Sequence, residues 1–132
     1  MHEQHAVTTL VVSRPGVMQQ SLRISLSVCP AVMVLASVGD GLTAVKQLEA
    51  HHPELVVIDA NLLPEEAAAL VDAVKTGSHH ARCLVFVQSS RHEAMMKAAG
   101  ADAVMLRDEP ADELRAVLAR LIAARGEPHA GR

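Results

Sequence analysis

The sequence predicts an α/β domain in which a parallel sheet is covered by helices on both faces. Short apolar runs alternate with segments of helical periodicity five times along the 132 residues. The run at 55–58 has no polar interruption, which is typical of a strand buried on both faces. Phe86 is the single aromatic residue in a chain that is 50% hydrophobic, so aliphatic side chains must fill the core.

The first two repeats each combine a short apolar run with a helix. Residues 10–12 and 31–36 are the apolar runs, and turn-forming residues follow them at 15–16 and 39–41. Beyond each turn, apolar residues recur at the spacing of one helix face, namely Met18, Leu22 and Leu26, then Leu42, Val45 and Leu48. Each repeat is therefore a strand followed by a helix.

The third and fourth repeats follow the same plan. Residues 55–58 form a strand that ends at Asp59, and Pro64 then opens a helix whose inward residues are Ala67, Leu70, Val71 and Val74. Residues 83–87 form the fourth strand. The helix after it ends at Gly100 and carries Met95, Met96 and Ala99.

The fifth repeat contains the clearest helix. Residues 103–106 form its strand, Pro110 stands at an early helical position, and the acidic residues 112–113 suit the start of a helix dipole. The apolar stripe consists of Leu114, Val117, Leu118, Leu121 and Ile122. We expect one domain over residues 8–125, with an N-terminal extension at 1–7 and a C-terminal tail at 126–132.

Five such repeats predict a flavodoxin-like (βα)5 three-layer sandwich with a five-stranded parallel sheet in the order 2-1-3-4-5. Right-handed crossovers place helices on both faces of such a sheet. Ligand sites form beyond the carboxyl ends of its strands, near the point where the strand order reverses. We therefore expect function to reside at that edge, which brings together Ser13, Asp59, Val87 and Arg107.

Charge and composition exclude several classes of protein. The net charge of -3, from 12 basic and 15 acidic residues, gives no basic surface of the kind that binds nucleic acid. Cys29 and Cys83 form neither a disulfide framework nor a metal motif. The first residues lack a signal-peptide pattern, and no apolar run is long enough to span a bilayer. These features predict a cytoplasmic protein that binds neither nucleic acid nor membrane directly.

Two segments resemble the receiver family of bacterial two-component response regulators. Residues 53–59, PELVVID, resemble the family's third strand, which ends at the phosphoacceptor aspartate. Residues 100–107, GADAVMLR, resemble the segment that leads to the family's site lysine. The similarity runs from Leu10 to Ile122 and is greatest to receivers that precede a helix-turn-helix DNA-binding domain.

This resemblance implies a non-enzymatic module of phosphorelay signal transduction. Its implied partners are a sensor histidine kinase or an output protein, and a homodimer through the fourth and fifth helices. In the family, an acidic pair holds Mg²⁺, while a hydroxyl residue and a lysine bind the phosphoryl group. Here the positions of the acidic pair, the hydroxyl, the switch aromatic and the lysine are taken, in chain order, by Ser13, Arg14, Val87, Val104 and Arg107.

Asp59 is the phosphoacceptor candidate that these substitutions leave in place. Mg²⁺ prefers oxygen ligands, usually carboxylates, and the neutral Ser13 and cationic Arg14 do not supply them. An arginine at 14 or 107 is expected to pair with the Asp59 carboxylate and to take over the electrostatic role of the metal. We therefore expect a degraded Mg²⁺ site, impaired Mg²⁺-dependent phosphorylation, and signalling through protein contacts.

Two alternatives within signalling remain open at this point. Asp59 is a working phosphoacceptor if Glu65 or Glu66 serves as a further metal ligand, and Ser89 or Ser90 supplies the hydroxyl if the fourth strand is offset. Alternatively, the chain is the regulatory fragment of a DNA-binding transcriptional regulator whose reader domain has been removed or is encoded beyond Arg132.

A small-ligand-binding protein on the same flavodoxin-like fold is a further alternative. The residues 39–41 are interpreted as a turn, because no glycine-rich phosphate motif with its lysine is present. The histidine pairs at 51–52 and 79–80 are interpreted as exposed loop residues rather than zinc ligands, because adjacent histidines point in different directions. Ser13 is expected to cap the helix that begins near Pro15.

Overall fold

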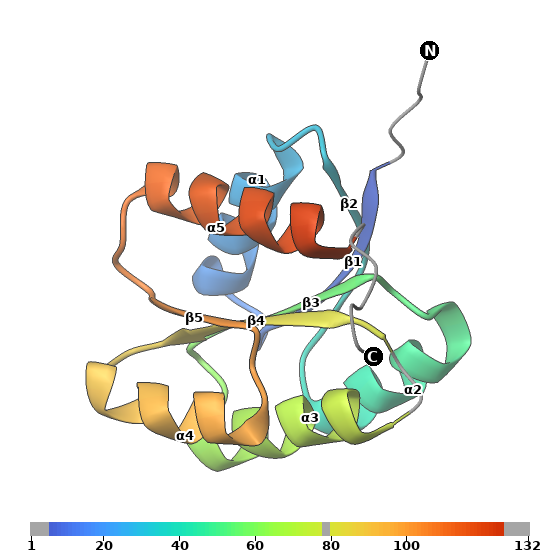
Figure 1. The fold of residues 1–132 in the computed structure, drawn as a ribbon, viewed down its shortest axis with the longest axis vertical. Coiled ribbons are helices and arrows are strands. Elements are labelled where there is room, and N and C mark those ends of the chain that lie inside the picture. Colours follow the sequence, from blue (N-terminus) through green and yellow to red (C-terminus); the bar gives the residue numbers. More distant parts are fainter. Residues whose placement is uncertain (1–5, 78–79, 126–132) are drawn as a thin grey trace.

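Five parallel strands form one sheet in the order β2-β1-β3-β4-β5 in the computed structural model, which describes residues 6–77 and 80–125. The strands are β1 (Val7–Val12), β2 (Val32–Val38), β3 (Leu55–Ile58), β4 (Arg82–Val87) and β5 (Ala103–Leu106). The helices are α1 (Val17–Ser27), α2 (Gly41–His51), α3 (Pro64–Thr76), α4 (Glu93–Ala99) and α5 (Ala111–Arg125) (Figure 1). The predicted fold class and strand order are confirmed.

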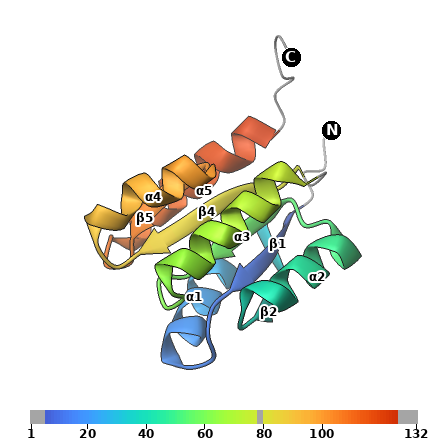
Figure 2. The ribbon, with the colours of Figure 1, turned by 90° about the horizontal axis from the view of Figure 1, so that it is seen from below.

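Helices cover both faces of the sheet, α1 and α5 on one and α2, α3 and α4 on the other (Figures 1 and 2). Each face has its own apolar core, one built around Leu22, Val57 and Leu118 and the other around Leu48, Val56 and Val71. Val56 and Val57 are both fully buried because successive strand residues point to opposite faces. No helix among residues 6–77 and 80–125 is long and apolar enough to cross a membrane.

Local sequence signals account for several helix ends. The Asp40 carboxylate caps α2 by accepting a hydrogen bond from the Thr43 N–H at 2.7 Å, and this bond lowers the pKa of Asp40. Pro64 occupies the first turn of α3, where its missing N–H costs nothing. Gly100 ends α4 with φ of 114°, a backbone conformation that favours glycine.

Strand β2 departs from its predicted span of 31–36. It covers Val32–Val38 and contains a bulge, because Thr9 of β1 lies opposite Val34 whereas Leu10 lies opposite Ala36. The extra residue shifts the alternation of side chains, so Val34 packs on the α1 and α5 face while Ala36 packs on the other. The shift depends on pairing with β1, so the alternation of apolar and polar residues along the sequence does not reveal it.

The expected domain boundary also moves by one residue. Val7, which we placed in the N-terminal extension, belongs to β1 and is 2% exposed. The C-terminal tail expected at 126–132 lies outside the described residues.

The sheet register brings the carboxyl ends of its strands to one edge. The Asp59 N–H donates to the Val12 carbonyl at 2.9 Å, and the Ser13 N–H donates to the Val38 carbonyl at 2.9 Å. On the far side of β4, the Arg107 N–H donates to the Val87 carbonyl at 3.0 Å. These bonds extend the strand ladders by one residue and hold Ser13, Asp59 and Arg107 in fixed positions.

Candidate functional site

Asp59 lies at the centre of this edge and its side chain is fully buried. Its Oδ2 accepts a hydrogen bond from the Ser13 hydroxyl at 2.9 Å. Its Oδ1 accepts one from the Ala60 N–H at 2.8 Å and one from Arg107 Nε at 2.9 Å. Burial of a carboxylate is costly unless it is paired and hydrogen-bonded, and here both conditions are met.

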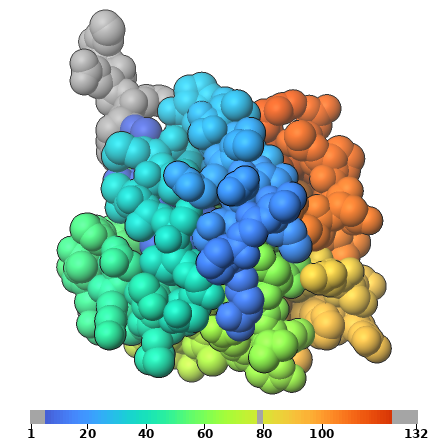
Figure 3. All heavy atoms as spheres, turned by 180° about the vertical axis from the view of Figure 1, so that it is seen from behind, coloured from blue at the N-terminus to red at the C-terminus, as the bar shows by residue number. Residues whose placement is uncertain are grey.

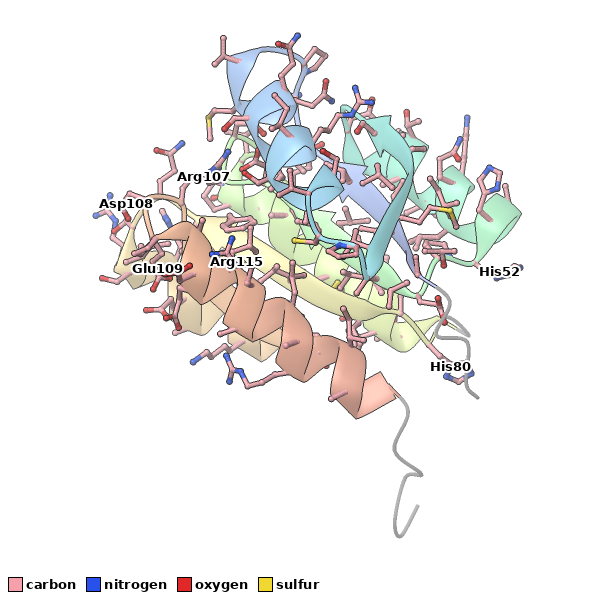
Figure 4. All side chains as sticks on the ribbon, turned by 90° about the horizontal axis from the view of Figure 1, so that it is seen from above. His52, His80, Arg107, Asp108, Glu109 and Arg115 are labelled. Atoms are coloured by element: carbon pink, nitrogen blue, oxygen red, sulfur yellow. The ribbon has the colours of Figure 1, made fainter. Side chains whose placement is uncertain are left out.

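Arg107 is held in place from several sides. Its Nη2 donates to the Met18 carbonyl of α1 at 3.4 Å, and its guanidinium lies 5.4 Å from the centre of the Phe86 ring. The side chain is 26% exposed, compared with 0% for Asp59. Figure 4 shows Arg107 at the end of the molecule where β5 leads into α5, followed by Asp108 and Glu109. Arg107 therefore links β5, β3 and α1.

Of the two arginines expected to pair with Asp59, Arg107 does so and Arg14 does not. Arg14 Nη2 lies 2.7 Å from Glu66 Oε1 of α3. The other oxygen of Glu66 accepts a hydrogen bond from the Gly41 N–H at the start of α2, at 3.0 Å. Glu66 competes for Arg14 because it lies at a helix start on the same edge of the sheet, which spacing along the chain does not show.

Ser13 also differs from its expected role as a helix cap. Helix α1 has Gly16 at its N-cap position, with no side-chain cap. The Ser13 hydroxyl instead donates to Asp59 and also accepts a hydrogen bond from Asn61 Nδ2 at 3.2 Å. Ser13 therefore hydrogen-bonds the Asp59 carboxylate and does not cap α1.

Asn61 is a site residue whose role sequence reasoning missed. Its Oδ1 accepts from the Arg14 N–H at 3.1 Å, and its Nδ2 donates to the Arg14 carbonyl at 3.2 Å. This two-point contact mimics backbone pairing and fastens the loop after β1 to the loop after β3. The sequence feature that could have pointed to Asn61 is its position two residues after Asp59, at the same end of the third strand.

The hydroxyl position at the end of β4 is apolar. Val87 is 4% exposed and ends the strand, so the strand is not offset. Ser89, the residue considered as a replacement, accepts the Arg91 N–H at 3.3 Å and caps a short 3-10 turn. Ser90 is exposed within that turn. Val104, at the switch-aromatic position, packs against the core on the α2, α3 and α4 face.

A pocket of about 390 Å³ opens beside Asp59, between the start of α3 and α4. Its walls are mostly aliphatic, and they include Leu62, Leu63, Val87 and Met96. The polar side chain of Gln88 also lines it and donates to the Ala60 carbonyl at 3.3 Å. The pocket offers Asp59 no second carboxylate.

The residues at this edge do not fit a magnesium ion. Both oxygens of Asp59 are engaged by Ser13, Ala60 and Arg107, and Glu66 is engaged by Arg14 and Gly41. Within residues 6–77 and 80–125, no group of three His, Cys, Asp or Glu side chains is placed to hold a metal ion. Arg107 pairs with Asp59 and Arg14 pairs with Glu66, so each of these carboxylates already has a cationic partner in place of a metal ion.

The other residues singled out in the sequence lie away from this site. His51 ends α2 rather than lying in a loop, and His52 follows it with φ of 48°. Both are exposed, as is His80. Figure 4 labels His52 and His80, and His79 lies outside the described residues. Cys29 and Cys83 are free thiols, and burial raises the pKa of Cys83 to about 12, so its reactive thiolate is scarce.

No family model matches the chain. The nitrate/nitrite response regulator protein NarL of Escherichia coli K12 is 26% identical over 120 residues. The match covers 89% of this chain and 56% of NarL. The chain therefore spans about half the length of this curated relative.

Solved structures of response regulators share the fold. The signal receiver domain of NarL from Mycobacterium tuberculosis has a TM-score of 0.78 at 22% identity, with 93% of this chain and 99% of that chain covered. A LuxR-family response regulator from Aurantimonas sp. SI85-9A1 has a TM-score of 0.79 at 21% identity, with 89% and 86% covered.

RcsB of Salmonella typhimurium, in a structure that concerns DNA interaction, has a TM-score of 0.80 at 13% identity, with 91% of this chain and 60% of that chain covered. The strand order, the aspartate at the end of β3 and the sequence similarity to NarL all agree. The chain has the fold of response-regulator receiver domains and is similar in sequence to the response regulator NarL.

Proposed function

We propose that this receiver domain signals through protein contacts, with its phosphate site held closed by Arg107 and independent of Mg²⁺. The ion pair between Arg107 Nε and Asp59 Oδ1, at 2.9 Å around a fully buried carboxylate, carries this proposal. The guanidinium engages Oδ1 of the carboxylate that a phosphoryl group or a metal ion would otherwise contact. The retained aspartate is then a structural anchor for β5 rather than an acceptor.

The energetics favour the closed state. Phosphoryl transfer needs a carboxylate oxygen free to attack and a cation to neutralise the developing charge. Breaking a buried pair such as Arg107 with Asp59 costs about 3 kcal/mol, which slows a reaction that requires it on the order of a hundredfold. The missing metal ligands at Ser13 and Arg14 add a second barrier.

Mass spectrometry after treatment with acetyl phosphate and Mg²⁺ tests the proposal. We expect the unmodified mass throughout. A matched variant carries Ser13→Asp, Arg14→Asp, Val87→Thr and Arg107→Lys, which restore the groups that the resemblance implies. We expect this variant to gain a phosphoryl group that a further Asp59→Asn change removes. Stoichiometric phosphorylation of Asp59 in the unaltered chain would contradict the proposal.

The partners proposed are a sensor histidine kinase or an output protein, in keeping with the receiver fold. DNA binding by a separate domain is a second candidate for the output. It is supported by the relatives, since the chain covers 56% of NarL and 60% of RcsB, and the RcsB structure concerns DNA interaction. The length of the full gene product tests this candidate, because a regulator of this kind requires a second domain.

A further inference from the structure

Exposed apolar side chains gather at one edge of the sheet. Among the described residues, six of the eight large hydrophobic side chains that are exposed lie along α1, β2 and the start of α2. We call this the β2-edge surface, and it consists of Val17, Ile24, Val28, Met33, Leu35 and Leu42. Figure 3 shows α1, β2 and α2 together on one face of the molecule.

The β2-edge surface is hollowed where α1 passes β2. A groove of about 400 Å³ is lined by Gln20, Arg23, Ile24, Ser27 and Val34. A second hollow of about 470 Å³ begins at Val28 and reaches the apolar side chains of Leu118 and Ile122 on α5. An interface that buries this surface therefore has concave places into which apolar side chains fit.

The size of the surface matches one side of a stable interface. Burying a side chain of this kind removes on the order of 100 Å² of apolar surface from water. The six side chains are exposed by between 39% and 83%, so together they offer on the order of 400 Å². One partner of a standard interface buries about 800 Å², of which somewhat more than half is apolar.

The charge of the surface favours a second copy of the same chain. In a two-fold symmetric dimer, a patch meets itself, so charges near the axis face like charges. Strand β2 contains no charged residue, and Arg23 is the one charged side chain lining the groove beside it. Arg115 lines the second hollow, where its charge is paired with Asp112. The surface is thus able to meet itself without strong repulsion.

The bulge in β2 determines how two copies meet. Leu35 is the extra residue of the bulge, and its side chain is 39% exposed at the free edge. A bulge disfavours continuation of the sheet into a neighbouring strand. Side-chain packing between closed pairs is therefore favoured over open-ended strand addition.

We propose that two copies of this chain pack their β2-edge surfaces together around a two-fold axis. The proposal is independent of the closed phosphate site, and it differs from the dimer through α4 and α5 that the family resemblance implies. Among the described side chains, Met95 of α4 is the one exposed large hydrophobic on that face, and α5 contributes none. The β2 edge therefore offers more apolar surface than the alternative face.

Sedimentation equilibrium tests the proposal at concentrations up to about 200 µM, a range that detects weak dimers. We expect a dimer whose dissociation constant rises at least about tenfold in Ile24→Glu and in Leu35→Glu, because each change places like charges opposite each other. Leu63→Glu and Met95→Glu are matched controls on exposed hydrophobics elsewhere, and we expect neither to change the constant. Circular dichroism checks that each variant is folded.

Cysteine cross-linking provides a readout that does not depend on destabilising the surface. We expect Ser27→Cys, in the groove, to form an intermolecular disulfide under mild oxidation faster than Ser90→Cys, which lies beside α4. A chain that stays monomeric throughout overturns the proposal. A dimer that persists in Ile24→Glu but dissociates in Met95→Glu also overturns the proposal. Acetyl phosphate has no part in either assay, so failure here leaves the phosphorylation test unaffected.

Discussion

Asp59 shows how a few neighbours determine what a retained residue does. Its carboxylate accepts hydrogen bonds from a hydroxyl, an N–H and a guanidinium, with no exposed surface. The cation among these donors is an arginine, whose planar group also stacks near Phe86. An aspartate at this position has the chemistry of a phosphoacceptor, but its neighbours hold it in a buried ion pair.

Removal of the cation is expected to destabilise the fold. Arg107→Gln leaves the Asp59 carboxylate buried without its charge partner, and we expect a loss of about 3 kcal/mol in the free energy of unfolding. Arg107→Lys keeps a charge but loses the stacking and the contact to the Met18 carbonyl, and we expect a smaller loss. Urea denaturation measures both. Equal stability of Arg107→Gln and the unaltered chain would show that the ion pair contributes nothing.

Two serines provide a matched pair for the hydrogen bonds. The Ser13 hydroxyl donates to Asp59, whereas the Ser37 hydroxyl is the one buried side-chain polar atom among the described residues without a partner. We expect Ser13→Ala to lower the free energy of unfolding by about 1–3 kcal/mol, and Ser37→Ala to leave it unchanged or raise it. The reverse order in urea denaturation would refute the assignment of these bonds.

At the scale of elements, the predictable features are those with a local cause. The uninterrupted run before Asp59 and the stripe in α5 depend on periodicity, and both elements form as expected. The bulge at Leu35 depends on pairing with β1, and the choice of Arg107 over Arg14 depends on Glu66 of α3. Such contacts join distant segments, so no pattern within one segment reveals them.

The cap of α2 is an element whose contribution depends on pH. The hydrogen bond from Thr43 lowers the pKa of Asp40 from its ordinary value of 3.8, so the folded state holds the charged form more strongly than the unfolded chain does. Its stabilisation is present above pH 3.8 and is lost as the pH falls through the lower folded value. We expect Asp40→Ala to reduce stability at neutral pH, with a difference that shrinks under acid. A difference independent of pH in thermal unfolding would exclude this cap.

At the scale of the whole molecule, the fold separates two surfaces. The carboxyl edge of the sheet holds the closed site around Asp59, and the free edge at β2 carries the exposed apolar side chains. Helix α1 contributes to both surfaces. The Met18 carbonyl accepts a hydrogen bond from Arg107, and the Ile24 side chain belongs to the β2-edge surface. The site around Asp59 and the β2-edge surface are therefore joined by one helix, α1.

Arg107 closes the site around Asp59 without metal or phosphate in the function proposed for this domain. Nuclear magnetic resonance of Arg107 Nε and the Ala60 amide, both of which donate to Asp59 Oδ1, reports on it directly. We predict that neither resonance moves when Mg²⁺ and beryllofluoride, a phosphoryl mimic, are added. Saturable shifts of both resonances, absent in Asp59→Asn, would show that the site opens and binds, and would contradict the account.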